Sequence, residues 1–286
     1  MKIGYYPGCS LQNSAKEYDR ATRLVARHLG IQLIDIQDWN CCGATAAHST
    51  DHFLAVALPA RNLIIAEQMG LDITVPCASC YQRLRVAHRE LTENEDLRQE
   101  VAKILGRQYQ GKVRIYSLVE TIASVGLEQL TAQVVRPLKD LRVACYYGCL
   151  LVRPPGIGCD DPENPLLMDK LLEAAKADTL DWGYKNECCG GSLVFGDRRV
   201  ALRLIHNILR NAVDAEATGI ACACPLCQSN LDLRQAQVNK EFGTSFAVPV
   251  FYFPQLLGLA MGLNPNDLGL GTHFVNPQRA LKTVSV

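Results

Sequence analysis

The chain has 286 residues, 48% of them hydrophobic, and its 29 acidic and 29 basic residues give a net charge of zero. No basic run or basic half occurs, so nucleic acid is excluded as an expected partner. The first residues form a strand pattern without an apolar signal region, and the longest apolar stretch, 251–263, is shorter than the roughly 20 residues that span a bilayer. We therefore expect a cytoplasmic protein that contacts membranes at most peripherally.

Strand-like and helical segments alternate along the first half of the chain. Apolar residues at helical spacing and glycines such as Gly30 and Gly70 mark the helices and their ends. The expected strands are 2–6, 31–36, 72–76 and 113–117, and the expected helices are 17–30, 51–69, 78–91 and 93–110.

The second half repeats this order. Its expected strands are 141–146, 179–182, 219–223 and 248–253, and its expected helices are 165–176, 198–218 and 226–239. Such alternation predicts an α/β protein with parallel sheets covered by helices. We expect two tandem similar domains, each a small parallel sheet flanked by helices, at residues 1–138 and 139–286. The second should end in an amphipathic tail, 251–263, which is expected to pack on the protein more readily than to lie on a membrane.

Ten of the 13 cysteines form two matching sets of five. Cys188, Cys224 and Cys227 follow Cys41, Cys77 and Cys80 by 147 positions each, whereas Cys149 follows Cys9 by 140. Seven residues are therefore inserted in the second copy, and the Pro/Gly-rich stretch 153–162 predicts a long surface loop there. The first cysteine set is Cys9, Cys41, Cys42, Cys77 and Cys80, and the second cysteine set is Cys149, Cys188, Cys189, Cys224 and Cys227.

These thiols favour metal binding over disulfides, because the cytosol keeps thiols reduced and a chain of this length needs no cross-links. Each cysteine group follows a strand, so each set should meet in loops at the carboxyl ends of the strands, where parallel sheets bind ligands. Five thiols with two adjacent ones suit an iron–sulfur cluster better than one tetrahedral zinc ion. Two zinc knots, and metal-free thiol exchange by the Cys-x-x-Cys pairs, remain as alternatives.

The residues around these cysteines resemble the B-type subunit of heterodisulfide reductase, and the resemblance runs end to end. The matching segments are Tyr6-Pro7-Gly8-Cys9-Ser10, Asn40-Cys41-Cys42-Gly43, Pro76-Cys77-Ala78-Ser79-Cys80, Tyr147-Gly148-Cys149, Asp160-Asp161-Pro162-Glu163-Asn164-Pro165, Cys188-Cys189-Gly190-Gly191, Cys224-Pro225-Leu226-Cys227-Gln228 and Phe253-Pro254-Gln255-Leu256-Leu257-Gly258-Leu259-Ala260. The resemblance implies one non-cubane [4Fe–4S] cluster on each cysteine set, two in all. It also implies a disulfide cleaved between the clusters, which makes the chain an oxidoreductase acting on sulfur groups.

The chain carries neither a ferredoxin cysteine run nor a dinucleotide-binding glycine pattern, so its electrons must come from a partner. The resemblance implies two partner subunits, a ferredoxin-like iron–sulfur subunit and a flavin-containing subunit, with either direction of disulfide chemistry open. The same repeat also resembles one component of some succinate or fumarate–quinone oxidoreductases. A quinone-linked electron-transfer subunit and a non-catalytic zinc-stabilised docking protein are therefore the alternative functions.

Other residues carry weaker expectations. Cys145 and Cys222 lie in predicted strands and are expected to be buried packing residues, although Cys145 is also a candidate extra ligand. Cys159 lies in the inserted loop and is expected to be incidental. His48 and His206 are candidate proton donors, against the simpler reading as surface or packing histidines. Arg153 is a candidate for binding an anionic group of the substrate.

Overall fold

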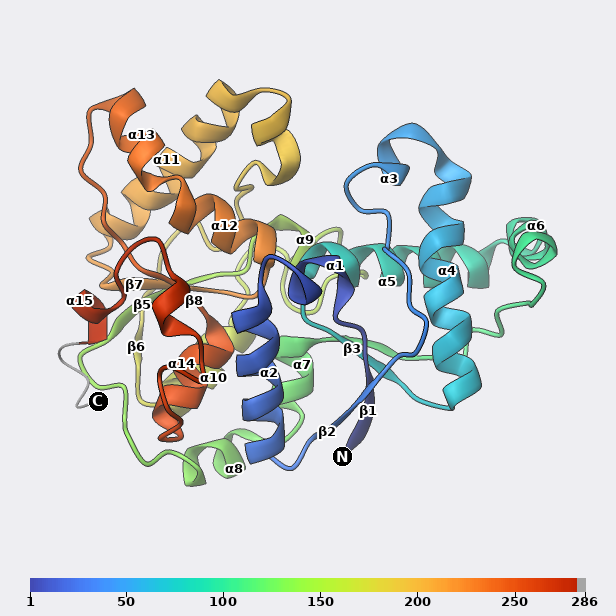
Figure 1. The fold of residues 1–286 in the computed structure, drawn as a ribbon, viewed down its shortest axis with the longest axis horizontal. Coiled ribbons are helices and arrows are strands. Elements are labelled where there is room, and N and C mark those ends of the chain that lie inside the picture. Colours follow the sequence, from blue (N-terminus) through green and yellow to red (C-terminus); the bar gives the residue numbers. More distant parts are fainter. Residues whose placement is uncertain (282–286) are drawn as a thin grey trace.

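The computed structural model describes residues 1–281 and forms two lobes, each built on a four-stranded all-parallel sheet flanked by helices (Figure 1). This confirms the expected fold class. The first lobe contains β1 (Lys2–Tyr5), β2 (Gln32–Asp35), β3 (Ile73–Val75) and β4 (Ile115–Ser117) in the order β2-β1-β3-β4. The second lobe contains β5 (Arg142–Tyr146), β6 (Asp178–Thr179), β7 (Gly219–Cys222) and β8 (Val250–Tyr252) in the order β6-β5-β7-β8.

Helices expected in the first lobe follow the sequence signals, except that the one expected at 93–110 ends at Leu105, before Gly106 with a φ of 69°. The Asp51 carboxylate accepts the Leu54 N–H at 2.7 Å and starts the longest of them, and Gly70 ends it with a φ of 63°. The helices are α1 (Gly8–Gln12), α2 (Lys16–His28), α3 (Ala47–Thr50), α4 (His52–Met69), α5 (Ala78–Glu93), α6 (Glu95–Leu105), α7 (Leu118–Ala123) and α8 (Leu127–Ala132).

Helices of the second lobe follow the same order, with two departures from expectation. The helix expected at 226–239 is divided at Arg234, whose φ of −97° and ψ of 3° end one helix before the next begins. The strand expected at 179–182 is shorter, because the Trp182 indole turns inward and donates to the Cys145 carbonyl at 3.1 Å. The elements are α9 (Cys149–Val152), α10 (Leu167–Ala174), η1 (Gly191–Phe195), α11 (Arg198–Asp214), α12 (Pro225–Leu233), α13 (Gln235–Phe242), α14 (Phe253–Ala260), η2 (Leu270–Thr272) and α15 (Gln278–Leu281).

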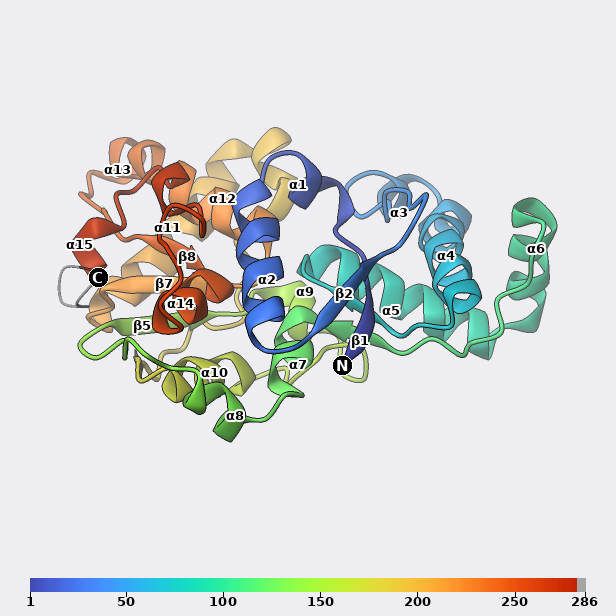
Figure 2. The same ribbon diagram turned by 60° about the horizontal axis from the view of Figure 1, so that its bottom comes forward.

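Each lobe supplies helices that cover the other. Helix α2 of the first lobe packs against α14 of the second, and α10 of the second packs against α7 and α8 of the first (Figures 1 and 2). All eight residues of α14 are buried, so the tail 251–263 packs on the protein as expected, but this helix within it has no exposed polar side. The two lobes therefore share one continuous hydrophobic core.

The inserted stretch 153–162 is also held against the other lobe. Arg85 of α5 donates from Nε to the Ile157 carbonyl at 3.2 Å and from Nη2 to the Gly156 carbonyl at 3.1 Å. Ile157 is buried. The insertion is thus the surface loop that its composition predicted, and it also forms a contact between the lobes.

Candidate functional site

The ends of the central strands deliver the cysteines to one edge of each sheet. In the first lobe β1 leads into α1 with Cys9, and β3 leads into α5, of which Cys77 is the N-cap and Cys80 lies in the first turn. In the second lobe β5 leads to Cys149 at the start of α9, and β7 leads to Cys224 at the N-cap of α12. Parallel strands that are neighbours in a sheet end at the same edge, and this brings each cysteine set together.

Thiols within each set are in direct contact. Cys42 Sγ lies 3.2 Å from Cys80 Sγ, and Cys189 Sγ lies 3.6 Å from Cys227 Sγ. Hydrogen bonds from the Cys41 and Cys80 thiols lower the pKa of Cys42 to about 4. The corresponding bond from Cys149 lowers the pKa of Cys188 to about 6. Cys42 and Cys188 are thus stabilised as thiolates, the form of cysteine that binds metals, while the same hydrogen bonds and burial raise the pKa of the donor thiols Cys41, Cys80 and Cys149.

The two sets also meet each other across the lobes. A hydrogen bond with Cys224 raises the pKa of the Cys77 thiol. Bonds from Cys227 and then Cys77 lower the pKa of Cys224. The Cys-x-x-Cys segments of the two lobes therefore lie side by side.

Glycines make room for these thiols. Gly8 and Gly148 have φ values of 68° and 67°, and a Cβ at either position would lie 3.1 Å from the Sγ of Cys80 or Cys227. Gly43, which follows the Cys41-Cys42 pair, has a φ of 76° and donates its N–H to Cys41 Sγ at 3.4 Å. The equivalent Gly190 has a φ of 87° and donates to the Cys188 sulfur at 3.3 Å. Positive φ values favour glycine. Glycine at these four positions thus allows both the close approach to the thiols and the N–H···S bonds.

Two buried tyrosines, Tyr6 in the first matching segment and Tyr146 directly before the segment Tyr147-Gly148-Cys149, hold the adjacent cysteines in place. The Tyr6 hydroxyl donates to the Asn40 carbonyl at 2.8 Å, and the Tyr146 hydroxyl donates to the Glu187 carbonyl at 2.6 Å. Asn40 and Glu187 directly precede the two Cys-Cys pairs. Tyr146 follows Tyr6 by 140 positions, the same offset as Cys149 from Cys9. This repeat is the sequence signal that could have identified the two tyrosines as part of the thiol sites.

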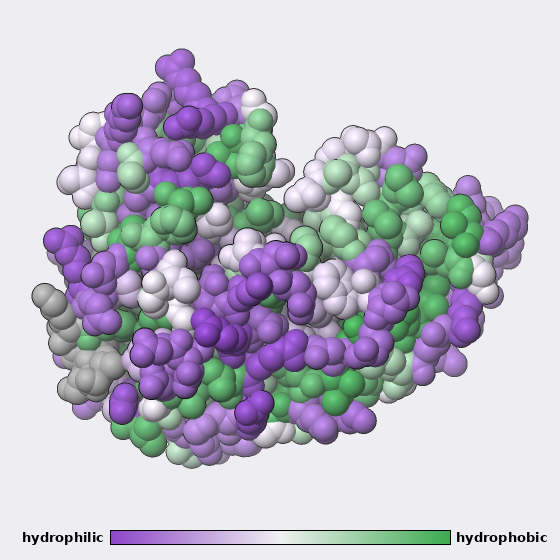
Figure 3. All heavy atoms as spheres, viewed as in Figure 1, coloured by the Kyte–Doolittle hydropathy of each residue, from purple (hydrophilic) through white to green (hydrophobic). Residues whose placement is uncertain are grey.

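A cavity of about 250 Å³ lies between the lobes next to the thiols. The molecular surface is hollowed between the two lobes (Figure 3). All five thiols of the second set line the cavity, whereas the first set contributes none. Residues beside the first set complete the wall, among them Ala44, Thr45, His48, Ser79, Gln82 and Arg83.

The other candidate residues, His48, Arg153 and His206, have different surroundings. Of the three, only His48 lines the cavity. Arg153 donates to the Pro162 carbonyl and pairs with Glu163 at 3.3 Å, both within or next to the insertion. His206 packs against Phe242, with ring centroids 4.5 Å apart.

The three remaining cysteines lie outside the cavity lining. Cys145 and Cys222 are fully buried in β5 and β7. Cys159 is partly buried in the insertion.

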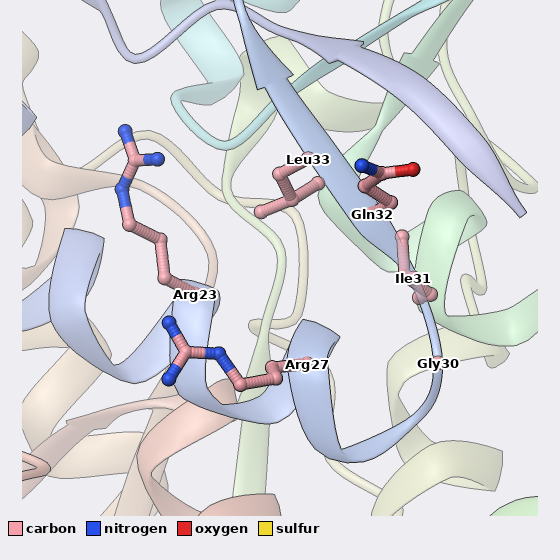
Figure 4. Close-up of a pocket in the computed structure, with 6 residues that line it drawn as sticks. All are labelled: Arg23, Arg27, Gly30, Ile31, Gln32 and Leu33. Atoms are coloured by element: carbon pink, nitrogen blue, oxygen red, sulfur yellow. The ribbon is translucent and has the colours of Figure 1, made fainter.

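A second hollow, beside Arg23 and Arg27, contains no thiol (Figure 4). It lies between α2 and β2 and has a volume of about 390 Å³. The Arg23 guanidinium is already neutralised, because it pairs with Asp19 at 2.9 Å and with Asp35 at 2.6 Å. The cavity beside the cysteines is therefore the candidate site.

The donor groups of the two sets suit an iron–sulfur cluster better than a single zinc ion. Among residues 1–281, no three Cys, His, Asp or Glu side chains are arranged to hold a single ion. Each lobe instead gathers five thiols, with backbone N–H groups directed at sulfur. Five soft ligands exceed the four that close a structural zinc site, and N–H···S bonds are among the features that tune iron–sulfur clusters. The residues thus fit a cluster of several irons.

Comparison with known proteins gives consistent matches. A family model described as a cysteine-rich domain, CCG, matches residues 3–85 and 143–232. The chain is 33% identical over 279 residues to the B-type subunit of the ferredoxin/F(420)H(2)-dependent CoB-CoM heterodisulfide reductase of Methanosarcina acetivorans, covering 94% of this chain and 92% of that protein. It is 30% identical to a protein of Archaeoglobus profundus described as like the heterodisulfide reductase B-type subunit, covering 94% of this chain and 93% of that one.

Two further comparisons concern the membrane and the fold. The chain is 32% identical to the 8-methylmenaquinol:fumarate reductase membrane anchor subunit of Wolinella succinogenes, covering 96% of this chain and 97% of that one. Among residues 1–281, however, no helix combines the length and apolar character needed to cross a bilayer. The crystal structure of a hypothetical protein from Helicobacter pylori shares the fold, with a TM-score of 0.78 at 15% identity. That match covers 96% of this chain but 52% of the other.

Proposed function

Because the chain belongs to the cysteine-rich CCG domain family, with two copies of the domain and relatives named as B-type subunits of heterodisulfide reductase, we propose that it is the catalytic iron–sulfur subunit of a heterodisulfide-reductase-like complex. Each cysteine set would hold one non-cubane [4Fe–4S] cluster. The observation that carries the proposal is a cavity between the lobes that is lined by all five thiols of the second set and by Ala78 and Ser79, which lie between Cys77 and Cys80 of the first set.

The proposed reaction converts one disulfide, two electrons and two protons into two thiols, or runs in reverse. Bound clusters would supply electrons one at a time, and a ferredoxin-like iron–sulfur partner and a flavin-containing partner would exchange them. The chain's own residues position the disulfide beside the exposed Cys188 and the half-buried Cys149. His48 at the cavity wall is the proposed proton donor, because an imidazole exchanges protons near neutral pH.

Metal and sulfide analysis tests the cofactor. Protein purified or reconstituted without oxygen should carry about eight irons and acid-labile sulfide, because two clusters of four irons are proposed. Absence of acid-labile sulfide after anaerobic reconstitution would contradict the proposal. About two zinc ions and no iron would instead indicate a zinc-stabilised docking protein.

A quinol-linked electron-transfer subunit is the second candidate, favoured by the similarity to the Wolinella succinogenes protein over nearly the whole chain. In that case the native protein should co-purify with membranes and with a flavoprotein dehydrogenase. Reduced quinol analogues should then reduce the clusters, whereas small disulfides should not oxidise them. Co-purification with a ferredoxin-like protein and cluster oxidation by disulfides would favour the heterodisulfide-reductase-like function.

A further inference from the structure

Arg83 is one of the positions beside the thiols at which the two copies differ. Asn230 follows Arg83 by 147 positions, the offset that relates Cys224 to Cys77. The buried Asn230 amide donates to the Cys189 carbonyl at 3.1 Å and to the Gly191 carbonyl at 2.9 Å. It therefore fastens the Cys-Cys-Gly loop of the second copy from inside. Arg83 makes no corresponding bond in the first copy, because its Nε donates to the neighbouring Gln82 side chain at 2.7 Å.

Arg83 lies in the wall of the cavity and brings a positive charge to it. No aspartate or glutamate is among the residues that line this cavity. Among residues 1–281, no carboxylate lies within ion-pair distance of Arg83, and Glu90, two turns further along α5, pairs with His52 at 3.1 Å. The Arg83 guanidinium thus forms no ion pair, and the negative groups that act on it, Cys42 and Glu90, do so without direct contact.

Partial burial makes this cation costly to leave unpaired. Desolvation lowers the pKa of Arg83, yet a guanidinium stays charged at neutral pH. Its planar fork matches the two oxygens of a carboxylate and two of the oxygens of a sulfonate or phosphate. An anion in the cavity would therefore form strong charge-assisted hydrogen bonds there.

We propose that Arg83 determines specificity by binding an anionic group, a carboxylate, sulfonate or phosphate, on the disulfide substrate. The inference rests on the proposed function and assigns the residue of the cavity wall that holds the anionic end of the disulfide. The anionic end would lie on the wall of the first lobe, with the sulfur atoms facing the thiols of the second set. Asn230, at the equivalent position of the second copy, is neutral. The orientation of the substrate with its anionic end at the first lobe would therefore be favoured over the reverse orientation.

Two disulfides of equal chain length test this recognition. The full chain, reconstituted with iron and sulfide, is assayed anaerobically with reduced methyl viologen, which supplies the two electrons for each disulfide. The probes are dithiodipropionate, which is dianionic, and bis(hydroxypropyl) disulfide, which is neutral. We expect wild type to favour the anionic probe by about tenfold or more in kcat/KM, the scale of one charge-assisted hydrogen bond.

Substitutions at Arg83 should change only that preference. Arg83→Gln should raise KM about tenfold for dithiodipropionate and leave the neutral probe unchanged, and Arg83→Lys should restore much of the loss. Arg89→Gln is the matched control, since it removes the same charge from an exposed position of α5. Calorimetric binding of dithiodipropionate to the oxidised protein, without viologen, should weaken about tenfold in Arg83→Gln and not in the control.

The outcomes separate the two hypotheses. Equal kcat/KM for both probes in wild type, or equal losses for both in Arg83→Gln, overturns the role of Arg83 while disulfide reduction stands. Reduction of neither probe by fully loaded protein contradicts the proposed function. Calorimetry then decides the role of Arg83 alone: retained binding in Arg83→Gln overturns it, and selective loss supports an anion site.

Discussion

Tyr18 and Tyr252 stack face to face across the two lobes, with ring centroids 4.1 Å apart and planes inclined by 5°. The Tyr18 hydroxyl donates to the Pro76 carbonyl at 3.0 Å, and Pro76 directly precedes Cys77. The Tyr252 hydroxyl donates to the Gln228 side chain at 3.5 Å, and Gln228 directly follows Cys227. The stacked rings thus join the Cys-x-x-Cys segments of both lobes.

Truncating this pair should strongly destabilise the fold. Tyr18→Ala is expected to lower the free energy of unfolding by about 3–5 kcal/mol, because it leaves a cavity between packed lobes. Tyr18→Phe should cost about 1 kcal/mol through loss of the bond to Pro76. Urea denaturation measures both, with Phe195→Ala, whose side chain is 85% exposed, as the control. A cost for Tyr18→Ala no larger than that of the control would contradict the role of the stack.

Gly8→Ala should prevent the first cysteine set from holding its cluster. The added Cβ lies 3.1 Å from Cys80 Sγ at a φ that alanine adopts only with strain. Gly30→Ala is the matched control, with a φ of 72° and no atom within 4 Å of the new Cβ. Both should lose about 1–2 kcal/mol of stability to backbone strain, but only Gly8→Ala should lose iron. Equal iron contents, measured after anaerobic reconstitution, would show that the close approach to Cys80 is unimportant.

Cys42→Ala and Cys189→Ala should each remove the iron of one set, leaving about four irons per chain. Disulfide reduction should nevertheless collapse in both variants, since the proposed reaction uses the two sets together. Iron analysis and the viologen-linked assay give the two readouts. Near-native reduction by a protein with half its iron would refute the paired mechanism.

Cys145→Ala and Cys222→Val should leave the iron content and the electron paramagnetic resonance signals unchanged. Their counterparts in the first copy are Tyr5 and Val75, and neither is a thiol. Both cysteines are fully buried in strands, so we expect a loss of about 1 kcal/mol in stability. An altered spectrum in Cys145→Ala would mean that the second set binds its cluster differently from the first.

A buried ion pair next to the second set should be costly to break. Lys185 Nζ lies 2.8 Å from Asp169 Oδ1, and both side chains are only 4% exposed. Lys185→Met should destabilise the protein by about 3–5 kcal/mol, because the Asp169 carboxylate is left buried without its cation. Adding Asp169→Leu should recover part of the loss.

The surface pair of Arg210 and Asp214, each 58% exposed, is the comparison for that ion pair. Arg210→Met should cost at most about 1 kcal/mol. Similar unfolding free energies for the Lys185 and Arg210 variants would contradict the stabilising role of the buried pair.

Much of the architecture was predictable because it is encoded locally. The alternation of strand and helix patterns predicted the two parallel sheets, and the repeated offset of 147 identified the equivalent cysteines of the two lobes, where Cys42 meets Cys80 and Cys189 meets Cys227. Helix α14 was expected to be amphipathic, but its polar Gln255 is buried and hydrogen-bonded to the Leu268 carbonyl at 3.0 Å. Hydrogen-bond partners of this kind lie outside the helix itself, so the hydrophobic periodicity of the helix cannot predict them.

Polar residues near the site were harder to place for the same reason. Arg153 and Arg83 are both arginines, a residue type that is usually exposed, so the sequence alone does not distinguish them. Their tertiary contacts do. Arg153 is paired with Glu163, whereas Arg83 faces a cavity without carboxylates. Tyr6 and Tyr146 resembled ordinary core residues, because their acceptor carbonyls lie 34 and 41 positions further along the chain.

The packing of α2 against α14 has a consequence for synthesis of the chain. Helix α2 ends at His28, but α14 is complete only at Ala260, close to the C-terminus. At translation rates of about 5–20 residues per second, α14 is synthesised roughly 10–50 s after α2, and the apolar side of α2 lacks its packing partner during that time. The second lobe must therefore emerge almost completely from the ribosome before the first can close. We expect ribosome-bound fragments that end before 253 to be sensitive to protease near α2, and slower translation to lengthen that exposure.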